Sequence, residues 1–189
     1  MLRLAFIVLA GVIAALIGIA LLPEQTRRIP DSKVQLKNAE VTLYPRADPE
    51  AVWHFSAPSV EYAPDTRETT LRNIENGERT LNGETDFTLR SEQVTIDADD
   101  NLRGERILVH LLDADWDLDM QGKDDRLALI DQSSGKFEVP VLLYSGQGIA
   151  ESRDENVRVN FDLTNFESGG PDTIGYSSFI ATSDEKEEP

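Results

Sequence analysis

Alternation of apolar and polar residues constrains this chain more than any other feature of its sequence. In residues 85–112 the apolar positions recur at every second residue: Phe87 and Leu89, then Val94 and Ile96, then Ile107, Val109 and Leu111. A period of two places each set on one face of a β-strand. Residues 97–104 interrupt the pattern with Asp, Asn and Gly, which favour turns. The pattern predicts a strand, a bend, a second strand, an Asp-rich turn and a third strand.

The same unit recurs along the chain. Trp53, Phe55, Ala57, Val60 and Tyr62 stand in the relation of Phe87, Leu89, Ser91, Val94 and Ile96, at a shift of 34 residues. A third unit opens with Trp116, Leu118 and Met120 and is closed by Leu127, Leu129 and residues 140–144, and a looser fourth comprises Ile149, Val157, Val159, Phe161 and Leu163. Units of this length that cannot bury an apolar face alone stack on their neighbours. We therefore expect one continuous all-β body with an apolar lining.

Shorter segments complete the predicted body. Residues 34–44 are expected to supply the first strand, and residues 174–180 a short edge strand. Glycines are expected to mark turns at Gly77, Gly83, Gly104, Gly122, Gly135, Gly146 and Gly148. No segment carries a sustained 3.6-residue period long enough for a major helix.

An apolar segment precedes this body. Residues 4–22 comprise 19 residues without a polar side chain. As a helix they would extend roughly 28 Å, close to the ~30 Å hydrocarbon core of a bilayer. The length favours an uncleaved transmembrane anchor, although Gly18-Ile19-Ala20 would also suit the cleavage site of a signal peptide. Arginines flank both sides of the segment, so charge does not set its orientation.

Small residues follow a four-residue spacing in this segment. Gly11 and Ala15 form one such pair, and Ala14 and Gly18 form another. This spacing lets a second helix approach closely within a membrane. Gly and Ala are also common in membrane spans generally, so the pattern leaves both interpretations open.

Charge and cysteine content narrow the functional classes. The chain has a formal net charge of −17, and all 35 acidic residues lie beyond Leu22. Such a body is repelled by nucleic acid and by anionic lipid surfaces. The absence of cysteine excludes disulfides and thiolate metal sites.

The sequence offers no catalytic constellation. Its two histidines, His54 and His110, alternate with apolar neighbours and are expected on the outward faces of their strands. No G-x-S-x-G, H-E-x-x-H or phosphate-loop motif occurs. We expect no enzyme, no catalytic residue and no cofactor.

Two acidic runs raise the question of a calcium site: Asp97, Asp99 and Asn101, and Asp113, Asp115, Asp117 and Asp119. The helix-loop-helix calcium motif needs Gly at its sixth position and Glu at its twelfth, and neither run supplies them. The second run also alternates with apolar residues, as a strand with an acidic outer face does. We expect solvated turn and strand carboxylates and no metal site.

The apolar lining allows two interpretations. Inward-facing residues of a β-body usually fill a packed core. An incompletely closed body would instead hold acyl chains against the same residues. The sequence pattern is compatible with both.

The chain resembles a known family. A short N-terminal segment, one apolar span and then WHFSAPSVEYAPDTRETTLRNI, FTLRSEQVTIDADDNLRGERILVHL and PVLLYSGQGIAES are similar to LptC, the single-span component of the bacterial lipopolysaccharide export system. The resemblance implies an OstA-like β-jellyroll, a twisted antiparallel sandwich that faces the periplasm and is anchored in the inner membrane. It implies a protein that accepts lipopolysaccharide or a related envelope lipid from an ABC transporter.

The resemblance also implies partners and site residues. LptF/LptG-like permease subunits would bind the anchor at Gly11, Ala14, Ala15 and Gly18, and an LptA-like bridge protein would dock on an edge strand. The lipid-groove candidates, assigned by strand parity, are Trp53, Phe55, Tyr62, Phe87, Leu89, Ile96, Leu118 and Val141. The alternative is a membrane-tethered structural or adaptor domain with a packed core and no lipid.

The expected organisation has four parts. Residues 1–22 form the anchor, residues 23–33 a linker, residues 34–180 the periplasmic β-domain and residues 181–189 an acidic disordered tail.

Overall fold

A computed structural model of the chain describes residues 33–169 and 175–176, which belong to one compact unit. Every regular element in these ranges is a β-strand, so the all-β prediction is confirmed. The described residues contain no helix long and apolar enough to cross a membrane. The predicted anchor at residues 4–22 and the predicted acidic tail lie outside the described ranges.

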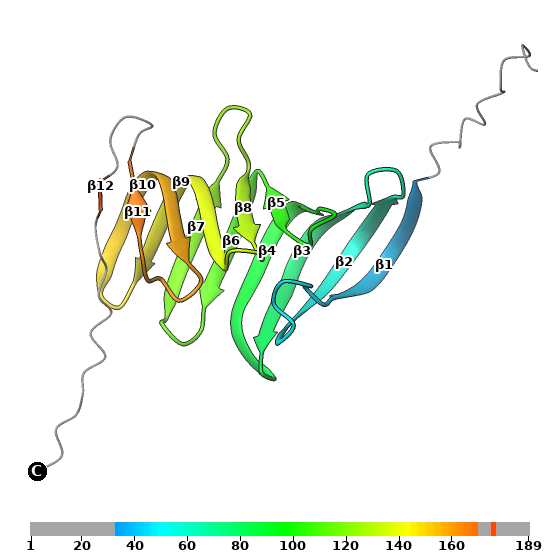
Figure 1. Cartoon of the computed structure of the whole chain (residues 1–189), viewed down its shortest axis with the longest axis horizontal. Coiled ribbons are helices and arrows are strands. Elements are labelled where there is room, and N and C mark those ends of the chain that lie inside the picture. Colours follow the sequence, from blue (N-terminus) through cyan, green and yellow to red (C-terminus); the bar gives the residue numbers. More distant parts are fainter. Residues whose placement is uncertain (1–32, 170–174, 177–189) are drawn as a thin grey trace, which may run out of the picture. The chain divides into compact units, whose positions relative to one another are not determined.

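Twelve strands make up the described structure (Figure 1). They are β1 (Val34–Leu43), β2 (Ala51–Ala63), β3 (Glu68–Leu81), β4 (Glu84–Ile96), β5 (Leu102–Gly104), β6 (Arg106–Leu111), β7 (Trp116–Gln121), β8 (Ala128–Asp131), β9 (Lys136–Gly146), β10 (Ile149–Asn160), β11 (Glu167–Ser168) and β12 (Gly175–Tyr176). The first strand begins where the sequence predicts it. The predicted edge strand at 174–180 is represented by β12 in the described residues.

The strands form one antiparallel sheet in nearly sequential order, from β1 (blue) to β10 (orange) in Figure 1. Strands β6 and β5 lie end to end along β4. β6 pairs with residues 87–90 of β4, and β5 pairs with residues 95–96. The register is unbroken, with Phe87 opposite Leu111 and Ile96 opposite Leu102. Similarly, β7 and β8 share the length of β9. The sheet is therefore a meander of long strands, two of them interrupted near their middle.

A line of backbone irregularities crosses the middle of these strands, and we call it the crease. Asn38, Asn73 and Asn156 have positive φ angles of 49°, 55° and 52°. Asparagine tolerates this left-handed conformation better than most residues do. Register shifts fall at the same level in β2, between residues 56 and 59, and in β3, between residues 74 and 77. Bulges bend strands, so the sheet folds along this line.

The crease divides the sheet into two halves that face each other. The first leaf comprises residues 39–57, 76–91, 106–121 and 142–154, and the second leaf residues 34–37, 59–74, 93–104, 128–139 and 157–168. Phe87 of the first leaf contacts Phe137 and Phe161 of the second, with ring centroids 5.7 and 5.8 Å apart. Phe87 and Phe137 are three strand positions apart in the sheet, so a flat sheet spaced ~4.8 Å per strand would keep them apart. The contact requires the two leaves to pack face to face.

The core lies between the leaves. The first three alternate positions of each repeat, and the one after its bend, are buried: Trp53, Phe55, Ala57 and Val60, and Phe87, Leu89, Ser91 and Val94. The skip from the third position to the fourth coincides with the crease. The predicted sequence of strand, bend and strand is thus confirmed, as two halves of one long strand in both β2 and β4.

Three sequence predictions in this region are wrong. Gly77 lies inside β3 and not in a turn, where its missing side chain leaves room for the ring of Phe55, 3.0 Å from an added Cβ. Gly104 also lies in a strand, as the last residue of β5. Gly146 is the last residue of β9 and borders the turn at residues 147–148. Leu127 is exposed and Leu129 lies on the outer face, because the inward positions of β8 are Ala128 and Ile130. β8 keeps the even-numbered inward parity of β7, and the parity changes within β9 instead, where Phe137 and Val139 and then Leu142 and Tyr144 are buried.

The two faces of the sheet predict a contrast in stability. Replacing Leu89, which is 1% exposed, by Ala should lower the free energy of unfolding by about 3 kcal/mol, because it leaves a cavity between the leaves. The matched change of Leu108→Ala, on the neighbouring strand but 38% exposed, should cost less than about 0.5 kcal/mol. Urea denaturation of both variants measures the difference. Equal losses would contradict this assignment of the faces.

Candidate functional site

The eight lipid-groove candidates divide into three groups in the structure. One buried cluster contains Trp53, Phe55, Phe87, Leu89, Ile96 and Leu118. Val141 is buried but lies outside this cluster. Tyr62 faces the same side as its partner Val34 and is 39% exposed. Strand parity therefore brings six of the residues together and leaves two apart.

Aromatic rings fill the space that the cluster encloses. Trp53 stacks on Phe55 at 5.4 Å and meets Phe87 edge-on at 5.2 Å. Phe137 and Phe161 continue the contacts from the second leaf, 4.8 Å apart. Such offset and edge-to-face pairs add to the stabilisation from burial. In this conformation the interior is packed against itself.

The edge opposite the crease, where the strands of both leaves end in turns, is here called the mouth. First-leaf turns at residues 44–50, 81–84, 111–116 and 146–149 meet second-leaf turns at residues 96–102, 131–136 and 160–166. A cleft of about 810 Å³ lies in the mouth. Its walls include the apolar residues Leu81, Phe87, Leu111, Phe161 and Leu163, and four aspartates, Asp48, Asp86, Asp113 and Asp162. The cleft therefore has an apolar floor beside the core and an acidic rim.

Among the residues that the structure describes, Arg79 is the one cation that lines this cleft. It occupies an inward position of β3, opposite Trp53 on β2, and is only 3% exposed. Its guanidinium pairs with Asp48 and Asp86 and lies over the rings of Phe87 and Phe161, at 5.2 and 5.0 Å. Its Nε is buried without a hydrogen-bond partner. A buried charge of this kind is stable only while its partners stay in place.

The sequence predictions did not include Arg79. The signal was available in the alternation of Gly77, Arg79 and Leu81, which places the arginine on the inner face once β3 is recognised. That strand was missed because few of its inward positions carry large apolar side chains.

Burial changes the proton affinity of Asp86. Desolvation raises the pKa of this carboxyl above its ordinary value of 3.8, and the charge of Arg79 only partly offsets that effect. On the outer face, Asp119 behaves in the opposite way. Burial is its largest single influence and raises its pKa, but hydrogen bonds from Arg106 and Gln121 with the charge of Arg106 outweigh it and lower the pKa.

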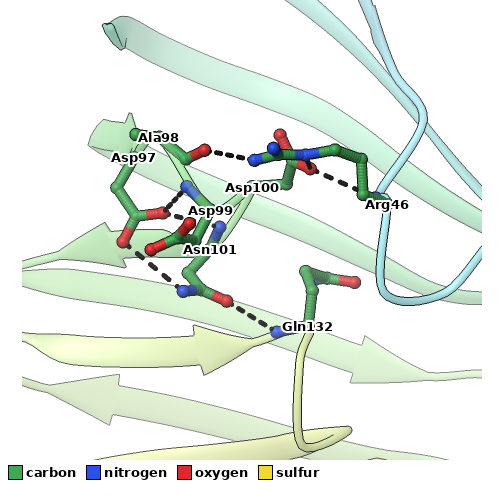
Figure 2. Close-up of polar contacts among 7 residues, drawn as sticks. All are labelled: Arg46, Asp97, Ala98, Asp99, Asp100, Asn101 and Gln132. Atoms are coloured by element: carbon green, nitrogen blue, oxygen red, sulfur yellow. Dashed lines mark hydrogen bonds and ion pairs between the residues drawn. The ribbon is translucent and has the colours of Figure 1, made fainter. Parts of the chain in front are cut away.

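The first acidic run forms a self-contained turn at the second-leaf side of the mouth (Figure 2). One carboxylate oxygen of Asp97 accepts hydrogen bonds from the backbone N–H groups of Asp99 and Asn101, at 2.9 and 3.0 Å. Its other oxygen pairs with Arg103 at 2.9 Å. In the described ranges, no three His, Cys, Asp or Glu side chains are placed to hold a metal ion. The carboxylate of Asp97 is thus engaged in shaping the turn.

The connection between β1 and β2 crosses the mouth. The backbone N–H and the Nε of Arg46 donate to one oxygen of Asp100, at 3.1 and 3.0 Å, and its Nη2 donates to the carbonyl of Ala98 (Figure 2). Two residues further on, Asp48 pairs with Arg79 of the first leaf. Residues 44–50, here called the strap, therefore contact both leaves.

A second buried polar group lies next to the Asp97 turn. Asn101 accepts a hydrogen bond from the backbone N–H of Gln132 at 2.9 Å (Figure 2). The side chain of Gln132 is buried, yet neither its amide nitrogen nor its carbonyl oxygen has a hydrogen-bond partner. Unpaired buried polar groups cost stability.

The outer faces of the strands carry the remaining polar candidates. His54 is exposed and lies 3.4 Å from the hydroxyl of Thr42, and His110 lies 3.0 Å from Asp117. On β7, Asp117 and Asp119 alternate with the buried Trp116, Leu118 and Met120. This confirms the predicted strand with an acidic outer face.

No protein-family model matches the sequence, and no curated protein matches it. The anchor candidates Gly11, Ala14, Ala15 and Gly18 lie outside the described residues. The functional assignment therefore depends on the residue pattern and on the folded sheet.

Asp86 and Asp119 should titrate on opposite sides of 3.8. Because the folded-state pKa of Asp86 is raised, its contribution to stability is full below pH 3.8 and is lost as the pH rises through the folded pKa. The contribution of Asp119 is full above 3.8 and is lost as the pH falls through its lowered pKa. Carboxyl-carbon NMR titration measures both midpoints, with Asp86→Asn and Asp119→Asn assigning the signals. A midpoint for Asp86 at or below that of Asp119 would contradict the burial argument.

Proposed function

We propose that this protein is a membrane-tethered lipid-transfer module with an OstA-like β-jellyroll body. It would accept lipopolysaccharide or a related envelope lipid from an ABC transporter in the inner membrane. It would then pass the lipid, along the apolar surface between its leaves, to a soluble bridge protein in the periplasm.

The folded sheet is the observation that carries the proposal. Both leaves turn a continuous apolar face inward, from Val60 on β2 to Val159 on β10. The leaves are joined along the crease by the strands themselves, so they can separate at the mouth without breaking the sheet. Separation would expose a lining suited to hydrocarbon chains, which gain free energy by leaving water.

The sheet edges support the proposed transfer between proteins. Among the described strands, β1 pairs only with β2, and β12 pairs only with β11. An unpaired strand edge presents backbone groups that can bind a strand of another protein. At the β1 end, Val34, Leu36 and Tyr62 are 48, 50 and 39% exposed on the inward side. A bridge protein of similar fold docked on the last strands would extend the apolar surface.

One observation favours the second candidate, an adaptor domain without cargo. The interior is closed in this conformation, with Trp53 and Phe137 fully buried and with aromatic rings in mutual contact. A permanently packed interior would serve only to hold the two edges at a fixed distance. The two candidates differ in whether lipid ever reaches the core.

Photo-crosslinking in living cells distinguishes them. A photoreactive amino acid at Phe87 or Leu118, which are 1% and 3% exposed, should form adducts of lipid mass if the leaves separate. The control is the outward-facing Thr88, opposite His110, where no lipid adduct is expected. Mass spectrometry of the purified chain identifies the adducts. Adducts formed only with neighbouring residues of the protein would favour the adaptor.

The proposed anchor generates a separate prediction. In a helix over residues 4–22, Ala15 lies on the small-residue face, and Ala20 lies about 180° away from Gly11. Ala15→Leu should weaken copurification of the full chain with permease subunits about tenfold, because the added bulk prevents close helix approach. Ala20→Leu, the same change on the opposite face, should have little effect. Quantitative pull-down from membranes checks both, and undiminished binding of Ala15→Leu would exclude this packing face.

A further inference from the structure

We propose that the mouth cleft is the port through which a hydrocarbon chain enters the protein, and that the strap closes it. This inference rests on the proposed lipid-transfer function and adds where the lipid enters and what controls entry.

The position of the cleft supports its assignment as the port. Its lining comes from both leaves: Leu81, Phe87 and Leu111 belong to the first, and Phe161 and Leu163 to the second. Phe87 is also a member of the core cluster, where it contacts Phe137. The floor of the cleft is therefore the edge of the core itself. A volume of about 810 Å³ lies within the range of small-molecule sites.

The strap connects the two leaves at this level by polar contacts. Arg46 binds Asp100 and the carbonyl of Ala98 on the second leaf, and Asp48 binds Arg79 on the first. Other cross-leaf contacts at the mouth, such as those of Phe161 with Phe87 and Arg79, are made by side chains that line the cleft. A chain entering the cleft would replace those apolar contacts with its own methylenes. Arg46 does not line the cleft, so an entering chain would leave its contacts in place unless the leaves separate.

The contacts of the strap are suited to breaking. The side chain of Arg46 is 67% exposed, so water competes for its hydrogen bonds with Asp100. Exposed ion pairs of this kind hold weakly. The strap thus closes the port without sealing it permanently.

The closed conformation also carries unpaired polar groups near the mouth. The Nε of Arg79 and both side-chain polar atoms of Gln132 are buried without partners. Separation of the leaves would admit water to these groups and recover part of the cost of burying them. This recovery offsets some of the apolar exposure that opening requires.

The experiment uses the full chain in amphipol and a palmitate analogue that carries a photoactivatable diazirine. The variant is Arg46→Ala, and its matched control is Arg106→Ala. Arg106 forms the same type of pair with Asp119, at 2.7 Å, with its side chain 63% exposed, but on the outer face of the first leaf. Peptide mapping measures the rate at which the probe labels residues 160–166.

Release of the strap should raise the initial labelling rate of residues 160–166 by about two- to fivefold, the range expected for loss of one exposed pair. Arg106→Ala should label at the wild-type rate. Equal labelling rates for the two variants would contradict the proposal that the strap closes the port. Labelling that is faster in Arg46→Ala but confined to residues outside the mouth would contradict the assignment of the cleft as the entry port.

A covalent cross-link that holds the strap against the second leaf tests the opposite change, a port that cannot open. The chain has no cysteine, so Arg46→Cys with Asp100→Cys introduces the only two thiols, which a short bismaleimide can join. Joining them should reduce labelling of residues 160–166 at least about tenfold relative to the unjoined double variant. The control pair, Thr42→Cys with His54→Cys, lies on adjacent strands of one leaf, and its joining should leave labelling unchanged.

The outcomes separate the inference from the function it rests on. If the core cluster is still labelled when positions 46 and 100 are cross-linked, the cleft is not the entry port, but the lipid-transfer function is not contradicted. Absence of labelling in every variant, together with no lipid adduct at Phe87 or Leu118 in cells, would overturn the proposed function itself.

Discussion

The structure depends on folding one sheet onto itself. A flat antiparallel meander with this sequence would expose one largely apolar face, including Trp53, Phe87 and Phe137, to water. Folding along the crease removes that face from water by pairing it with itself, which supplies the main driving force for a chain without helices in its described body. The positive-φ asparagines and the bulges allow the bend locally.

Apolar packing between the leaves is least complete at the mouth. At the crease the backbone is continuous, but at the mouth the leaves meet through turns, and the chain places charged groups there. Arg79 lies between two aspartates at the edge of the core, and the strap reaches across to the turn that contains Asp100. Polar contacts hold a specific geometry while remaining open to competition from water. A packed interior and a polar, separable mouth are compatible with a body that closes when empty and opens for a chain.

Sequence reasoning reached the class of the fold and most of the core. Alternation identified the inward residues of β2, β4, β6 and β7, because half-buried strands have a period of two that is visible in one dimension. It failed on β3, where Gly77 and Arg79 occupy inward positions, and on β8, where the inward Ala128 is small and the apolar Leu127 and Leu129 face outward. Both failures have one cause: the pattern reports which residues are apolar, whereas the fold decides which positions face inward.

Part of the candidate site was also visible in the sequence, and part of it required the tertiary structure. The amino-acid sequence by itself determined that the chain is an acidic, cysteine-free β-protein with a repeated apolar face and an apolar N-terminal segment, because these properties are local or additive. Only the tertiary structure decided that the two halves of each strand face each other, that Arg79 is buried, and that Arg46 meets a residue 54 positions away. Those contacts join segments whose separation in sequence carries no periodic signal. They exist because burying the apolar face brought the ends of the strands together.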